Sequence, residues 1–527
     1  MTATLVAINK PDVSWSRPEH PLLVGKDILE LLSSSMYIDP MAMYREYIQN
    51  SADAIDSARV AGVTSDVGKV LVKIDPNART IIIRDNGIGL KADDFADRLT
   101  ALGGSKKRGT AARGFRGVGR LAGLAFAQEV IFRSRQEGEK TVHELRWSAR
   151  DVRSMLRSTE TKDLKDIVGN SVEVREVERH DWPARFFEVE LNGVVRHRDD
   201  RLLNREAVFN YLAQVAPVPF HPEFQFAEQI TSLLHSHGVR TSTINIEIDG
   251  IGRVFRPHRN STAIGKVGET RFHELTTICT PGRDGDTSAV SWVLHSDYKG
   301  ALPSASLVDG WRFRVGDIQV GDNDLLMPLF PESRFNAWCV AETHVIDPRI
   351  LPNGRRDHFE QNAFFLDLTN HLAPHTRDIA QRCRASSIQR NLQRKIDVGL
   401  TDCERKLKVL ARSGLGESSA SRAAVQLVRD MEQIEQWIKR ASISNDRQDK
   451  YQKVIKKLRK RLAHVQDRSG TSSALNTFTS GQRSLLIEVF HSIHESQSDI
   501  EKSQEMVDRI LKRLARTFKR GPKRRNY

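Results

Sequence analysis

The sequence predicts an α+β protein in three parts: a mixed helix-and-strand domain, a second sheet-containing domain, and a helical carboxyl-terminal region. Helical and β-branched runs alternate up to about residue 180, and strand-like runs of period two reappear at residues 243–248 and 311–315. Glycine, proline and aromatic residues then become sparse after about residue 366. We therefore predict domains at residues 1–190, 191–370 and 371–511, followed by a basic tail at 512–527.

The composition favours packed domains with excess positive charge. Hydrophobic residues make up 39% of the 527 residues, and 81 Lys and Arg against 67 Asp and Glu give a net charge of +14. This excess is compatible with a polyanionic partner and says nothing about the fold. The four cysteines show no C-x-x-C spacing, and we find neither a secretory signal pattern nor a membrane-spanning apolar run. We expect a cytoplasmic protein without a disulfide framework or zinc ribbon.

The first domain begins with helical patterns and continues with strands. Apolar residues at helical spacing predict helices over residues 22–35 and 39–61. Two β-branched runs, at residues 70–74 and 80–84, flank Asp-Pro-Asn and predict a hairpin. A further strand is predicted at residues 171–175.

The later parts show different periodicities. Residues 205–214 predict a helix, whereas residues 243–248 and 311–315 alternate at period two, which predicts strands with one buried face. Long charged stretches at residues 432–464 and 480–518 predict helices of a bundle or coiled coil.

A polar stripe on the helix at residues 39–61 is the first candidate site. Glu46, Asn50 and Asp53 are spaced i, i+4 and i+7, so they share one helix face. A carboxylate here suits a base that activates water, the amide oxygen of Asn50 suits Mg²⁺, and Asp53 adds a polar anchor. Taken alone, the stripe is more typical of a solvated helix face.

A second motif, Asp85-Asn-Gly-Ile-Gly, follows the hairpin directly. Gly87 and Gly89 would let the backbone approach a flat ligand closely. The carboxylate of Asp85 can accept a hydrogen bond from an exocyclic amine, which would select adenine. A tight turn capped by an Asp is the alternative.

The third motif is a glycine-rich segment between residues 103 and 123. The backbone N–H groups of a glycine loop that opens a helix form an anion site, and a lysine would add charge for phosphates. It is not a Walker A loop, and a flexible loop is the alternative. The candidate phosphate-binding residues are Gly103, Gly104, Ser105, Lys106 (or Lys107), Gly114, Phe115, Gly117, Val118 and Gly119.

The order and spacing of the three motifs resemble the GHKL ATPase superfamily (gyrase B, heat-shock-90 chaperones, histidine kinases and MutL). The segment Arg45-Glu-Tyr-Ile-Gln-Asn-Ser-Ala-Asp-Ala is most similar to the chaperone, MutL and MORC branch. Glu46 distinguishes this branch from histidine kinases, which generally lack that carboxylate. The resemblance covers about residues 20–180 and implies a Bergerat-type α/β sandwich that binds ATP and Mg²⁺.

The resemblance also implies two further groups of site residues. Residues 168–175 resemble the last superfamily motif, with Asn170 where Thr is usual and Ser171 next to it; a plain edge strand is the alternative. The second domain resembles a transducer module, which delivers a cation to the γ-phosphate. Arg355 and Arg356 are the candidates, and a surface turn that pairs with nearby carboxylates is the alternative.

Together these features imply a Mg²⁺-dependent ATP hydrolase that works as a nucleotide-gated homodimeric clamp. The net charge and the basic tail at residues 512–525 favour DNA as its partner, and relatives of MORC in prokaryotes suggest a role in genome or anti-phage defence. The alternative is a heat-shock-90-like chaperone acting on polypeptides. A histidine kinase is disfavoured because Glu46 is present and the helices follow the ATP site.

Overall fold

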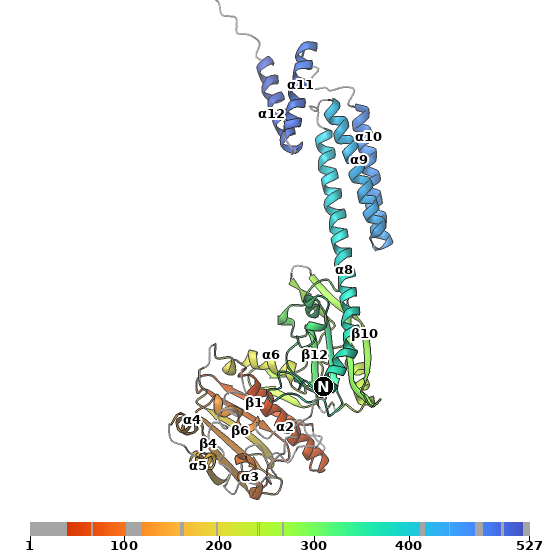
Figure 1. The fold of residues 1–527 in the computed structure, drawn as a ribbon. Helices are drawn as coiled ribbons and strands as arrows, with labels where there is room; N and C mark the ends of the chain where they lie inside the picture. The colour runs from red at the N-terminus through yellow and green to blue at the C-terminus, as the bar shows by residue number, and fades with distance from the viewer. Residues whose placement is uncertain are drawn as a thin grey trace, which may run out of the picture. The chain divides into compact units, whose positions relative to one another are not determined.

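The computed structural model is a mixed α/β fold with a long helical carboxyl-terminal region, as predicted (Figure 1). It divides into two compact units, Met1–Ala380 and Gln381–Tyr527. The helix predicted at residues 22–35 lies outside the described residues. The structure describes residues 39–64, 67–101, 119–158, 163–196, 199–239, 241, 243–265, 268–411, 417–441, 443–468, 478–496 and 500–519.

An eight-stranded sheet forms the first half of the first unit, in the order β5-β4-β3-β6-β2-β1-β7-β8. The predicted hairpin is confirmed, since β1 and β2 pair antiparallel. Strands β7 and β8 come from the segment predicted to belong to the second domain, and β7 pairs parallel with β1. The strands are β1 (Lys69–Asp75), β2 (Thr80–Asp85), β3 (Glu129–Arg135), β4 (Thr141–Ser148), β5 (Val172–Glu178), β6 (Phe186–Asn192), β7 (Asn245–Ile248) and β8 (Gly252–Arg253).

Helix α2 is the predicted helix over residues 39–61. Its apolar side chains, among them Tyr44, Ile48 and Ile55, are buried in one core with Val72 and Ile83 of the hairpin. This burial fixes the opposite, polar stripe at the edge of that core. The helices of this half are α2 (Ala42–Val60), α3 (Ala92–Thr100), η2 (Gly119–Ala125), α4 (Ala149–Arg157), α5 (Leu164–Ser171), η3 (Arg201–Leu203), α6 (Arg205–Val215) and α7 (Ala227–Ser236).

A six-stranded sheet, β13-β12-β14-β11-β10-β9, forms the second half of the unit. The prediction of one buried face is wrong for β12, because Arg312 and Arg314 are buried like Trp311 and Phe313. The elements are β9 (Ser261–Ile264), β10 (Gly268–Pro281), β11 (Thr287–Ser296), η5 (Ser304–Ser306), β12 (Gly310–Val315), β13 (Ile318–Val320), η6 (Met327–Leu329), η7 (Ser333–Trp338) and β14 (Val340–Val345).

A buried charge network explains why Arg314 occupies an inner position of β12. Glu342 on β14 pairs with Arg314 at 2.9 Å and with Arg256 at 2.7 Å, and Arg256 also pairs with Asp317. Arg256 follows β8 and donates to the Val218 carbonyl at 3.2 Å. Because each buried charge has an opposite partner, the network joins the end of the first sheet to the second sheet.

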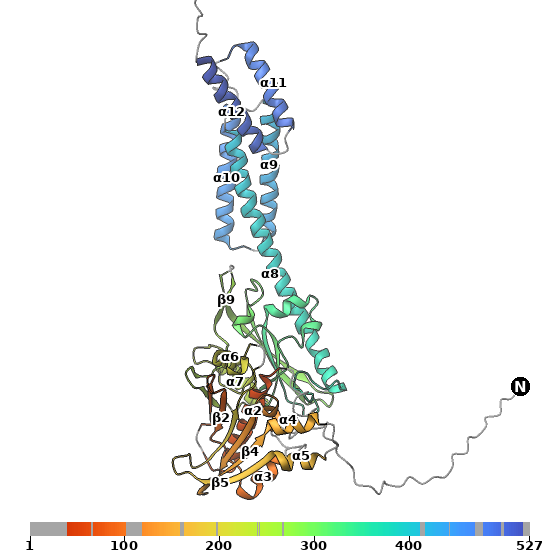
Figure 2. The ribbon, with the colours of Figure 1, turned by 90° about the vertical axis from the view of Figure 1, so that its left-hand side faces the viewer.

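The carboxyl-terminal region is helical, as predicted. In both views α8, α9 and α10 lie side by side (Figure 2), and their apolar faces share one core. Each of the two predicted long helices is in fact two helices. The sequence between α9 and α10, Ala-Ser-Ile-Ser at residues 441–444, contains no glycine or proline that would have predicted a break. The helices are α8 (Ala363–Leu410), α9 (Glu417–Arg440), α10 (Asn445–Arg468), α11 (Ser480–Ser496) and α12 (Ile500–Lys519).

Candidate active site

The polar stripe of α2 lies at the boundary of the first core. Glu46 and Asn50 are half-buried, and Asp53 is buried. The neighbouring side chains Tyr44 and Ile48 are fully buried on the other side of the helix. The three polar residues are therefore held on one face while the apolar face anchors the helix.

An arginine from the second half of the unit lies beside Glu46. The Nε atom of Arg356 is 3.7 Å from Oε1 of Glu46, and Nε of Arg45 is 3.8 Å from the same oxygen. Arg356 is buried, whereas the neighbouring side chain of Arg355 is exposed. The structure thus separates the two candidates that the sequence left equal: only Arg356 lies at the carboxylate.

Arg45 holds the loop that presents Arg356. Its guanidinium donates to the carbonyl oxygen of Arg355 at 2.9 Å and to that of Arg356 at 3.4 Å. Arg356 has a positive φ of 56°, a backbone conformation that non-glycine residues rarely adopt. A positive φ at a non-glycine residue persists where surrounding contacts impose it. The hydrogen bonds from Arg45 are contacts of this kind.

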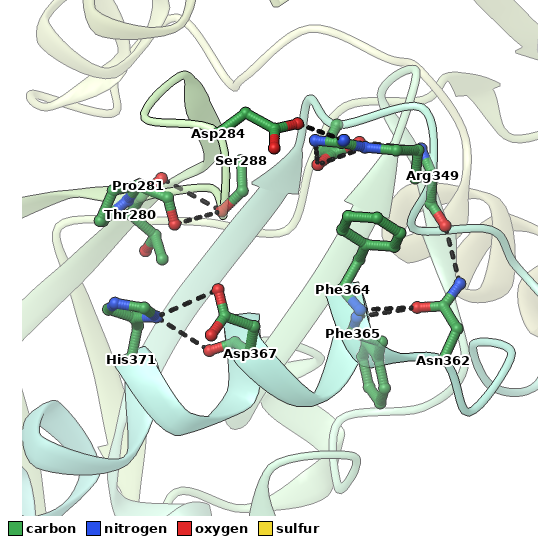
Figure 3. Close-up of polar contacts among 11 residues, drawn as sticks. Thr280, Pro281, Asp284, Ser288, Arg349, Asn362, Phe364, Phe365, Asp367 and His371 are labelled. Atoms are coloured by element: carbon green, nitrogen blue, oxygen red, sulfur yellow. Dashed lines mark hydrogen bonds and ion pairs between the residues drawn. The ribbon is translucent and has the colours of Figure 1, made fainter.

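The base of this loop is closed by a second set of contacts (Figure 3). Asn362 donates from Nδ2 to the Arg349 carbonyl at 2.8 Å, and its Oδ1 accepts from the Phe365 amide at 2.9 Å, at the start of α8. The guanidinium of Arg349 pairs with Asp347 at 2.8 Å and with Asp284. The loop that carries Arg356 is therefore closed by residues that also fix the beginning of α8.

The end of the glycine-rich segment touches Glu46. A Cβ atom added at Gly119 would lie 2.4 Å from Oε2 of Glu46. The hydroxyl of Tyr47 accepts from the Gly123 amide at 2.9 Å and donates to the Arg120 carbonyl at 3.2 Å, so α2 and η2 are joined. The remaining phosphate-binding candidates lie outside the described residues: Gly103, Gly104, Ser105, Lys106, Lys107, Gly114, Phe115, Gly117 and Val118.

Arg120, next to Gly119, is a residue that the sequence prediction missed. Its Nε and Nη2 atoms are buried, and within the described structure they have no hydrogen-bond partner. Burial lowers the pKa of Arg120 to about 10, so the side chain stays charged at neutral pH. A buried donor without a partner is costly, so an anion at this place would be bound favourably.

Asp85 is buried at the end of β2. One carboxylate oxygen accepts from the Gly87 amide at 2.8 Å, and Ser51 also hydrogen-bonds the side chain. Burial outweighs these contacts and raises the pKa of Asp85 to about 7. A Cβ atom at Gly87 would lie 2.6 Å from that of Ala54, and Gly89 has a φ of 72°, so both positions require glycine.

Asn170 and Ser171 do not join this group. They end α5 and precede β5, and β4, β3 and β6 lie between β5 and β2, which carries Asp85. Four strand spacings amount to about 19 Å. The two residues therefore do not lie beside Asp85 in this sheet order, and their contact with the nucleotide stays a prediction.

Arg185, immediately before β6, lies near Asp85 instead. Its positive charge partly offsets the rise that burial causes in the pKa of the Asp85 carboxyl. Its guanidinium also donates to the Asn86 carbonyl at 3.2 Å. No signal in the sequence indicates this proximity, because it follows from the pairing of β6 with β2.

A family model agrees with this geometry. The model described as histidine kinase-, DNA gyrase B-, and HSP90-like ATPase matches residues 42–178, which include α2, the hairpin and Asp85. The chain therefore carries a GHKL-type ATPase domain over these residues.

The same region is similar to bacterial proteins named chaperone protein HtpG. The protein of Rickettsia akari is 37% identical over 139 residues, which cover 23% of this chain and 22% of the relative. That of Albidiferax ferrireducens is 31% identical over 140 residues, which cover 23% of this chain and 21% of the relative. The chain thus matches about a fifth of the length of these relatives.

Proposed function

We propose that this protein is a Mg²⁺-dependent ATP hydrolase that acts as a nucleotide-gated homodimeric clamp on DNA in the cytoplasm. The observation that carries the hydrolase part is the meeting of Glu46 with Arg356. A carboxylate from helix α2 and a cation from the loop between β14 and α8 meet beside Gly119, at the end of the glycine-rich segment. This arrangement suits phosphoryl transfer, in which a base orients water and cations stabilise charge on the transferring group.

Each residue has a specific role in the proposed reaction. Glu46 accepts a proton from the attacking water as its oxygen bonds to the γ-phosphorus, and the bond to the β–γ bridging oxygen breaks to give ADP and phosphate. Arg356 stabilises the charge on the γ-phosphoryl oxygens. The buried guanidinium of Arg120 adds a second cation for the triphosphate.

The residues present also fit adenine and Mg²⁺. The buried carboxylate of Asp85 would accept from the exocyclic amine of adenine, and the missing side chain at Gly87 lets this turn pack closely against Ala54 of α2. Asn50 offers an amide oxygen, a hard ligand, on the same helix face as Glu46. Bound Mg²⁺ would screen the charge of the triphosphate.

The proposed gating depends on the loop that carries Arg356. The cation belongs to the loop between β14 and α8, and Arg45 on α2 holds that loop. Closure of the site on ATP would therefore bias the position of this loop and of the start of α8. We propose that this movement closes a homodimer.

DNA is the proposed partner because the chain carries a charge of +14 and basic residues gather near its end. A defence role rests on the resemblance to MORC relatives alone. A chaperone is the second candidate, because the matched relatives are named HtpG. Among the described residues, no helix has the length and hydropathy needed to cross a membrane.

Two assays test the proposal. ATP turnover dependent on Mg²⁺ tests the hydrolase, and an absence of turnover by the full chain would contradict it. Mobility shift on long duplex DNA across a salt series, with and without a non-hydrolysable ATP analogue, tests the clamp. Suppression of client aggregation without DNA binding at low salt would favour the chaperone.

A further inference from the structure

Helix α10 carries a dense row of basic side chains that the proposed ATP site does not use. Residues 450–461 read Lys-Tyr-Gln-Lys-Val-Ile-Lys-Lys-Leu-Arg-Lys-Arg, which is seven basic residues and no acidic one. At 1.5 Å per residue this stretch is about 16 Å long. It lies entirely within the second unit.

The apolar face of α10 is already occupied. Tyr451, Ile455, Leu458 and Leu462 are buried in the core shared with α8 and α9. The apolar side chains therefore cannot insert into a lipid bilayer, and the basic side chains must project from the other side of the helix.

Four lysines form that other side, which we call the α10 lysine face: Lys453, Lys456, Lys457 and Lys460. They are spaced i, i+3, i+4 and i+7, so they share one stripe of the helix, and all four are exposed. In the part of the chain that the structure describes, no acidic side chain forms an ion pair with any of them.

Two acidic residues on the helices packed against α10 pair with other residues of α10. Glu435 on α9 pairs with Arg459 at 3.0 Å, and Asp397 on α8 accepts from the Tyr451 hydroxyl at 2.7 Å. These two contacts lie on the side where α10 packs against its neighbours. The positive charge of the α10 lysine face is therefore left for an external anion.

We infer that the α10 lysine face binds the phosphate backbone of duplex DNA. Lysine ammonium groups act as point charges on phosphates, and a rigid row of them suits the regular charge of a duplex. The one aromatic residue of this stretch, Tyr451, is buried, so no ring is available for the base stacking that single strands prefer. Contacts of this kind position a protein on DNA without reading its sequence.

This inference rests on the proposed DNA clamp and gives it a second contact, separate from the predicted tail. The test uses the full chain, with the tail intact and without nucleotide, so that it does not depend on ATP hydrolysis. The variant replaces all four lysines of the face with Gln. The matched control replaces four exposed lysines of the first unit with Gln and so changes the net charge by the same amount: Lys73, Lys91, Lys140 and Lys165.

Binding of a fluorescent duplex of random sequence is measured between about 50 and 200 mM salt. We expect at least a tenfold loss of affinity in the α10 variant and a salt slope that is shallower by about 3, since slope scales with the number of phosphate contacts. The control should bind within about threefold of wild type. Circular dichroism and thermal unfolding establish that both variants remain folded.

Equal affinity of the α10 variant and wild type would overturn the inference and leave the tail as the DNA contact. Equal loss in both variants would overturn it in favour of a net charge effect. Tighter binding of single strands or of anionic phosphatidylserine vesicles than of duplex DNA would also overturn it. Should the variant misfold, the pair Lys453→Glu and Lys457→Glu replaces it with the same expected outcome. Loss of ATP turnover in Glu46→Gln with unchanged DNA binding would leave it standing.

Discussion

The Nε atom of Arg356 lies 3.7 Å from Oε1 of Glu46, so a cation from the loop after β14 meets the carboxylate of α2. Glu46 is half-buried and Arg356 is buried, so the pair is only partly screened by solvent. In the proposed reaction this carboxylate receives a proton and this guanidinium stabilises the γ-phosphoryl group. The pair therefore joins helix α2 to the loop between β14 and α8.

Arg356 and Arg355 give a matched pair of variants. We predict that Arg356→Ala lowers kcat for ATP about 10²-fold or more, because it removes a cation from a partly buried site. Arg355→Ala should change kcat less than about threefold, since that side chain is exposed. Steady-state phosphate release measures both, and equal effects of the two variants would contradict the assignment.

Arg45 should act by positioning Arg356. Arg45→Met keeps much of the side-chain volume but removes the donors to the carbonyls of residues 355 and 356. We predict that kcat falls at least tenfold while nucleotide affinity stays within about threefold, because the loop is no longer held. A matching fall in ATP affinity would show that Arg45 serves the binding pocket instead.

Asn362 gives an independent test of the same loop. Asn362→Ala removes both the bond to the Arg349 carbonyl and the cap of α8. We predict a lower kcat for Asn362→Ala. Asn362→Asp keeps the capping oxygen and loses only the donor to the Arg349 carbonyl, so its loss in kcat measures the contribution of loop closure alone. Isothermal titration with ADP serves as the control, and we expect ADP affinity to be unchanged in both variants.

Arg120 should contribute to triphosphate binding. Arg120→Gln removes a buried positive charge whose Nε and Nη2 atoms have no partner among the described residues. We predict weaker binding of ATP by about tenfold and little change in the thermal stability of the nucleotide-free protein, because no described ion pair is lost. A variant that binds ATP normally, or that is strongly destabilised without nucleotide, would assign Arg120 a structural role.

Asp85 makes stability depend on pH with a definite sign. Its pKa is raised from 3.8 to about 7, so the folded protein holds the proton more tightly than the unfolded chain does. The stabilisation is complete below about pH 4 and is lost as pH rises through about 7. Asp85→Asn cannot ionise, so its stability relative to wild type should rise by about 2 kcal/mol between pH 5 and pH 8.

Chemical denaturation of the nucleotide-free proteins at the two pH values measures this difference. A constant difference between Asp85→Asn and wild type would contradict a raised pKa. The same variant should bind ATP at least tenfold more weakly at pH 8, because a neutral amide oxygen is a weaker acceptor for an exocyclic amine than the carboxylate. Unchanged affinity would exclude adenine recognition at this residue.

Local patterns predicted the elements around the site well. Helix α2, the hairpin of β1 and β2, and α6 were all foreseen, because apolar periodicity and turn residues are local signals. The sequence could not decide between Arg355 and Arg356, since the two are adjacent and their directions depend on the local backbone, which is left-handed at Arg356 and held by Arg45.

The failures were failures of long-range order. Asn170 and Ser171 were placed at the ATP site from a local motif, whereas the sheet order separates β5 from β2, which carries Asp85, by three strands. The prediction of one buried face missed the burial of Arg314 on β12, because its charged partner Glu342 comes from a different strand. The order of strands in a sheet and the partner of a buried charge both depend on residues far apart in the sequence, so the pattern of one short segment cannot predict them.

The most direct test of the central claim is ATP turnover by Glu46→Gln, compared with wild type at saturating ATP and Mg²⁺. Gln keeps the size and polarity of the side chain but cannot accept the proton of water. We predict a kcat at least about 10²-fold lower, with ATP affinity within about threefold of wild type. A variant that binds ATP and turns it over at the wild-type rate would contradict the role of Glu46 as the base.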